Sequence, residues 1–79
     1  MQNPAKFLVV IDSAGEMIAR MFDAQHRMMV DFDASSSEVA VMTQGLAPAR
    51  GAAGKEWDGA LGGHSRRERE QAEVYTLDV

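Results

Sequence analysis

The chain has 79 residues, no cysteine and a formal net charge of -4, which predicts one domain without disulfide bonds. Leu, Ile, Val and Phe together supply only 16 residues, so we expect a thin hydrophobic core that a second subunit could complete. The excess of acidic residues argues against general electrostatic binding of nucleic acid, which requires a basic surface. A signal peptide and an apolar run of about 20 residues are both missing, so we expect a cytoplasmic protein outside the membrane.

Three extended segments are predicted at the start of the chain. Residues 6–11 are apolar on both faces, which is typical of a central strand. Residues 16–22 follow a turn in which Gly15 can take a positive φ, and residues 26–32 form the third strand of an antiparallel meander. The side chains that alternate onto one apolar face of the third strand are Met28, Val30 and Phe32.

The period then changes from two residues to that of a helix. Ser35 and Glu38 form a capping box, in which each side chain binds the backbone amide of the other residue, so a helix is predicted over residues 36–44. Residues 47–54 are rich in Ala and Gly and are predicted to be a flexible loop with nothing to anchor it to a core. One or two further helical turns are expected around Trp57.

The C-terminal part repeats the same capping pattern. Ser65 and Glu68 predict a short helix over residues 66–72 that is polar on almost every side. Residues 74–79 alternate again and form a fourth strand, which we place beside the doubly apolar first strand. Residues 1–79 are therefore predicted to form a single small α+β domain: a three-stranded antiparallel meander, two or three short helices, and a C-terminal strand in the order 4-1-2-3.

This architecture predicts a homodimer through the sheet. If the helices cover one face, the other face carries Leu8, Val10 and Met29, which is too apolar for a face left in water. A second copy would bury it, since twofold dimers are the commonest closed assembly. The alternative is that the helices lie on both faces.

Catalytic chemistry is not indicated. The chain has no cysteine nucleophile, no Gly-x-Ser-x-Gly elbow and no phosphate-binding loop, so we expect neither an enzyme nor a cofactor. Asp31, Asp33 and His26 could in principle hold a metal ion. Aspartates at strand ends more often cap turns, however, and we predict no metal site.

Two further features could serve a partner. Arg66, Arg67 and Arg69 form the one local basic cluster, but glutamates interleave with them, which favours a solvated, salt-bridged surface over phosphate binding. Trp57 could anchor a partner, although closing the core beneath a loop is the more common role. The leading hypothesis is a non-catalytic protein-binding or regulatory domain that acts as a homodimer. The alternatives are a weak nucleic-acid-associated protein that uses Arg66–Arg69 and a small metal-binding protein.

Overall fold

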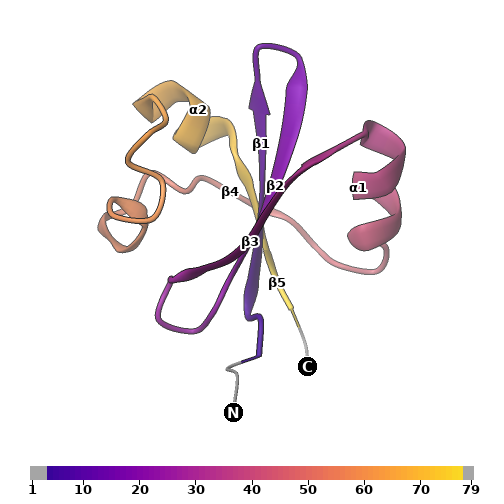
Figure 1. Ribbon diagram of the computed structural model, residues 1–79, viewed down its shortest axis with the longest axis horizontal. Coiled ribbons are helices and arrows are strands. Elements are labelled where there is room, and N and C mark those ends of the chain that lie inside the picture. Colours follow the sequence, from indigo (N-terminus) through magenta and orange to yellow (C-terminus); the bar gives the residue numbers. More distant parts are fainter. Residues whose placement is uncertain (1–3, 78–79) are drawn as a thin grey trace.

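Five antiparallel strands form one strongly twisted sheet in the computed structural model, which describes residues 4–77 (Figure 1). The strand order is β3-β2-β1-β5-β4, so the predicted meander and the C-terminal strand beside β1 are confirmed. The strands are β1 (Phe7–Ser13), β2 (Glu16–Phe22), β3 (Met28–Ala34), β4 (Ala49–Arg50) and β5 (Glu73–Thr76).

β1 is the central strand because its side chains are covered from both faces. Leu8, Val9, Val10 and Ile11 are all at most 5% exposed. The turn into β2 uses left-handed backbone at Ala14 (φ 53°) and Gly15 (φ 86°), a pair of conformations that matches the twist of a two-residue hairpin. The amide of Gly15 donates to Asp12 Oδ1 over 3.3 Å, which helps to fix the turn.

The pairing of β2 with β3 contains a bulge. Met28 lies opposite Phe22, but Val30 lies opposite Met21. Three consecutive residues of β3 therefore face two consecutive residues of β2, and Met29 is the extra one. Residues directly opposite one another share a sheet face, and Met28 and Val30 therefore lie on opposite faces. The predicted single apolar face of Met28, Val30 and Phe32 is wrong for this reason, since an inserted residue reverses the alternation.

Both predicted capping boxes are present. In α1 (Ser36–Met42), the Glu38 amide donates to Ser35 Oγ over 3.2 Å, and in α2 (Arg66–Gln71) the Glu68 amide donates to Ser65 Oγ over 3.1 Å. Between them, the turn around Trp57 is a single 3₁₀ turn, η1 (Lys55–Trp57). Within residues 4–77 no helix is long and apolar enough to span a membrane.

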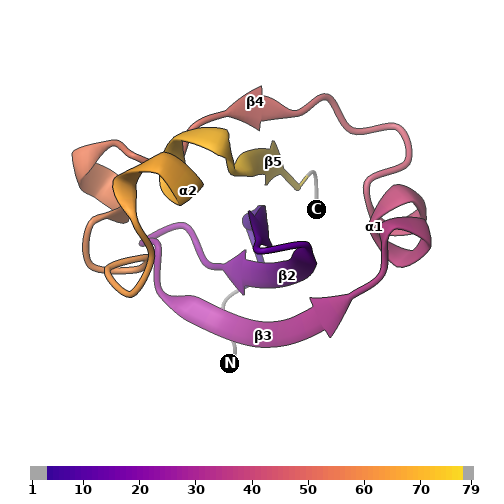
Figure 2. The same cartoon turned by 90° about the horizontal axis from the view of Figure 1, so that it is seen from above.

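The helices lie on both faces of the sheet rather than on one (Figure 2). We call the cluster under η1 and α2 the aromatic cluster, and the cluster under α1 the methionine-rich cluster. The buried members of the aromatic cluster are Val9, Ile11, Phe22, Ala52, Trp57, Leu61 and Ala72. The methionine-rich cluster buries Leu8, Val10, Ala19, Val39 and Tyr75, and its partly buried members include Met17, Met21 and Met42. Of the two arrangements that the sequence left open, the structure therefore has the one with helices on both faces.

The segment 47–54 is attached to the core, contrary to the prediction that nothing in it could be anchored. β4 pairs with β5, the amide of Gly51 donates to the Ala72 carbonyl over 2.9 Å, and the amide of Ala52 donates to the Arg69 carbonyl over 2.7 Å. Ala52 is fully buried. A small side chain and backbone hydrogen bonds thus fix a segment whose composition resembles that of a linker.

Candidate functional site

The residues proposed for the sheet-face dimer lie in two different environments. Leu8 and Val10 are 1% and 5% exposed and belong to the methionine-rich cluster beneath α1. Met29 lies on β3 and is 39% exposed. A second copy could therefore reach Met29, whereas Leu8 and Val10 are covered by other residues of the same chain.

Trp57 closes the aromatic cluster. It is 4% exposed, its ring meets Phe22 edge-on at 5.0 Å between centroids, and it stacks on His26 at 4.3 Å. Such edge-on and stacked contacts stabilise a core beyond the area they bury. The indole is thus engaged inside the domain and offers almost no surface to a partner.

The basic cluster is largely neutralised. Arg66 Nε lies 3.0 Å from Glu70 Oε1, and Arg69 Nη1 lies 2.9 Å from Asp58 Oδ1. Arg67 is exposed, and among the residues that the structure describes no ion pair of Arg67 is found. In the described part of the chain, the predicted basic cluster thus consists of two paired arginines and the exposed Arg67.

The residues considered for a metal ion are separated by their local partners. Asp31 lies 3.3 Å from Arg20 Nε across the β2–β3 ladder, whereas His26 stacks on Trp57 and its Nδ1 lies 3.1 Å from the Glu56 carbonyl oxygen. Over the described part of the chain, no group of three or more His, Asp or Glu is placed to hold a metal.

The turn before β3 is organised by Asp23. Its Oδ1 accepts the amides of Gln25 and Arg27 over 2.9 and 3.0 Å, and its Oδ2 accepts from Arg27 Nε over 3.1 Å. These hydrogen bonds, the Arg27 amide foremost, lower the pKa of the Asp23 carboxyl. His26 takes a left-handed conformation, φ 63°, a region in which histidine is enriched among the non-glycine residues.

The pKa values of one further carboxyl group and of the tyrosine phenol are also shifted by their surroundings. Hydrogen bonds from Ser13 and then Ser65 lower the pKa of Glu68. Burial, followed by the 2.6 Å hydrogen bond of its hydroxyl to Glu73 Oε2, raises the pKa of Tyr75. Glu68 belongs to the capping box of α2, and the hydroxyl of Tyr75 is held by Glu73, so both groups stabilise local structure.

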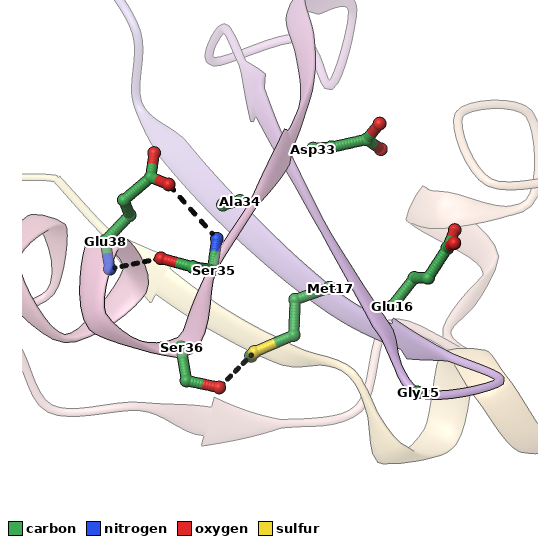
Figure 3. A pocket seen from close by; sticks show the side chains of 8 residues that line it. All are labelled: Gly15, Glu16, Met17, Asp33, Ala34, Ser35, Ser36 and Glu38. Atoms are coloured by element: carbon green, nitrogen blue, oxygen red, sulfur yellow. Dashed lines mark hydrogen bonds between the residues drawn. The ribbon is translucent and has the colours of Figure 1, made fainter.

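A broad hollow of about 560 Å³ lies where β2 and β3 approach the start of α1 (Figure 3). Its serines are already engaged: Ser35 caps α1, and Ser36 Oγ donates to Met17 Sδ over 3.4 Å. The carboxylates of Glu16 and Asp33 extend from the hairpin side of the hollow, apart from Glu38. The hollow therefore offers carboxylates without an activated nucleophile or a base paired to one.

In the described part of the chain, three of the four exposed large apolar residues lie on β3. β3 is the last strand on its side of the sheet, and every residue from Met28 to Asp31 is exposed. Met28 is 54% exposed and Val30 45% exposed. Because an edge strand presents unpaired backbone N–H and C=O groups, β3 combines free hydrogen-bonding capacity with adjacent apolar side chains.

Comparison of this chain with family models, with curated proteins and with solved structures gave no match.

Sequence reasoning identified part of this edge. The predicted strand order already placed the third strand at an edge, and Met29 was among the candidate interaction residues. Met28 and Val30 were missed, because a perfect alternation would have placed them on a core-facing surface. The run of three apolar residues, Met28-Met29-Val30, was the available signal, since a regular half-buried strand would alternate throughout.

Proposed function

We propose that this chain is a non-catalytic protein-binding domain whose binding element is the edge of β3. The observation that carries the proposal is the run of exposed apolar residues on a seven-residue edge strand, in a domain whose two sheet faces are both occupied. An extended segment of a partner protein would hydrogen-bond to the free backbone groups of β3, while its side chains contact those of β3 on either face.

The proposal replaces the sheet-face dimer as the preferred mode of association. Leu8 and Val10, which that dimer would need, are buried in the methionine-rich cluster. Self-association of the chain stays a prediction, and sedimentation velocity up to high-micromolar concentration tests it.

A library of random extended peptides displayed on phage tests the proposal directly. We expect the wild-type protein to enrich binders that are lost with Val30→Lys, because a lysine on β3 places a charge among the exposed apolar residues. Val41→Lys is the matched control, since Val41 is also an exposed valine, 72% exposed, but lies on α1. It should retain the same binders.

Hydrogen exchange locates the binding site. Enriched peptides should slow amide exchange in β3 and leave α1 unchanged. Peptides that bind Val30→Lys as well as the wild type, or a library that enriches no peptide protecting β3, would contradict the proposal.

A further inference from the structure

The two sides of β3 differ in chemistry. Val30 and Phe32 lie opposite Met21 and Ala19 of β2, so they share the face of the methionine-rich cluster. Asp31 and Asp33 point to the other face. An alternating acidic and apolar strand therefore forms the outer edge of the sheet.

The acidic side of β3 is only partly neutralised. Asp31 lies beside Arg20, at 3.3 Å. Asp33 lies opposite Ile18 of β2, which has no charge to offer, and in the described part of the chain no ion pair of Asp33 is found. Figure 3 shows Glu16 of β2 on the same side of the β2–β3 pair as Asp33, so a second carboxylate adds to the negative charge there.

A second copy of this chain is a poor occupant of the edge. Antiparallel pairing of two β3 strands about Asp31 would set Asp31 opposite Asp31, and pairing about Phe32 would set Asp31 opposite Asp33. Like charges directly opposite one another in a sheet are destabilising. A register about Val30 avoids this but must pair across the bulge at Met28-Met29.

We propose that β3 binds an extended partner segment in which basic residues alternate with apolar residues. This inference rests on the proposed function of β3 as a strand-binding edge. The basic side chains of the partner face Asp31 and Asp33, and its apolar side chains cover Val30 and Phe32. Side chains directly opposite one another in adjacent strands are close enough for both kinds of contact, so charge and burial select the same register.

Four capped synthetic nonapeptides provide the probes. The first alternates Lys with Val, the second replaces each Lys by Glu, and the third replaces each Lys by Gln. The fourth has the composition of the first but groups its lysines at one end and its valines at the other. Fluorescence anisotropy gives each affinity, and hydrogen exchange shows whether β3 is protected.

We expect the alternating Lys peptide to bind tightest and to protect β3, and added salt to weaken it, since exposed charges are screened. Asp33→Asn should weaken this peptide about two- to fivefold, the range of a cross-strand charge pair. Glu70→Gln is the control, because Glu70 is an exposed carboxylate on α2 whose ion-pair partner is Arg66, and it should leave the affinity unchanged.

The outcomes separate the two proposals. If the Glu or Gln peptide protects β3 as well as the Lys peptide does, the edge binds strands but the basic preference is overturned. Equal binding of the grouped peptide likewise overturns the alternation. If none of the four peptides protects β3, or if the protein alone protects β3 by self-association, this inference fails; the library experiment above then decides whether β3 binds strands of another chemistry.

Discussion

The aromatic cluster and the methionine-rich cluster cover opposite faces of one sheet with different kinds of side chain. In the first, Trp57 contacts Phe22 and Phe7 edge-on, at 5.0 and 5.5 Å. In the second, partly buried methionines pack against a cluster that includes Val39, the one buried residue of α1. Rigid rings bury a large area in a fixed geometry, whereas methionine adapts to an irregular gap. The comparison teaches that one face of the sheet is packed through a few aromatic contacts of fixed geometry and the other through adaptable methionine side chains.

The substitution with the largest expected effect on stability is Trp57→Ala, which tests the aromatic cluster. We expect the free energy of unfolding to fall by about 3–5 kcal/mol, the usual cost of removing a buried aromatic ring. That loss is comparable to the whole stability of a chain this small, which is roughly 4–12 kcal/mol. Urea denaturation followed by far-ultraviolet circular dichroism measures it. Trp57→Phe should cost less, and a loss below about 1 kcal/mol for Trp57→Ala would mean that the indole does not close this cluster.

Val39→Ala makes the matching test on the other face. Removing two buried carbon atoms and leaving a small gap should lower the free energy of unfolding by about 1.5–2.5 kcal/mol. The neighbouring methionines can move into the gap, which keeps the cost near the lower end. The same denaturation experiment gives the value, and Val41→Ala, at an exposed position of the same helix, serves as the control. A cost equal to that of Trp57→Ala would remove the distinction between the two clusters.

The two capping boxes permit a smaller comparison between the faces. Ser35→Ala and Ser65→Ala should each lower the free energy of unfolding by about 1 kcal/mol, because each removes an acceptor from a helix N-terminus. Hydrogen exchange should then show faster opening of α1 in the first variant and of α2 in the second. If both variants speed exchange throughout the sheet, the helices do not open independently and the two faces unfold together.

The smallest expected effect concerns pH and the turn that brings His26 onto Trp57. Because hydrogen bonds lower the pKa of Asp23 in the folded protein, its charged form stabilises the fold above the carboxyl pKa of the unfolded chain. This contribution is lost as the pH falls through the lowered pKa of the folded state. Asp23→Asn retains an oxygen acceptor but removes the charge, so its free energy of unfolding should depend less steeply on acidic pH. Parallel curves for the two proteins would show that the charge of Asp23 does not contribute.

Much of the fold could be predicted because the deciding signals were local. The doubly apolar segment of β1 determined the strand order, since a strand covered on both faces needs neighbours on both sides. Ser35 and Ser65 marked the helix starts through their pairing with Glu38 and Glu68. These features depend on residues within a few positions of one another.

The remaining features depend on contacts distant in sequence. Ala52 is buried in the aromatic cluster and its amide donates to the Arg69 carbonyl, and no local pattern distinguishes it from a linker alanine. The bulge that separates Met28 from Val30 arises from pairing with β2, so the exposed apolar run on β3 could be recognised only with the sheet in place. Local sequence patterns do not show which face of the sheet each connection crosses. Whether the helices lie on one face or on both could therefore not be predicted.

The placement of the only tryptophan and the only tyrosine gives the molecule two natural reporters. Trp57 belongs to the aromatic cluster and Tyr75 to the methionine-rich cluster, so the near-ultraviolet spectrum contains one indole signal and one phenol signal from opposite sides of the same sheet. Excitation at the red edge selects the indole, and the phenol band can be followed separately by dichroism. Loosening of either face can therefore be observed on its own, without attaching a dye.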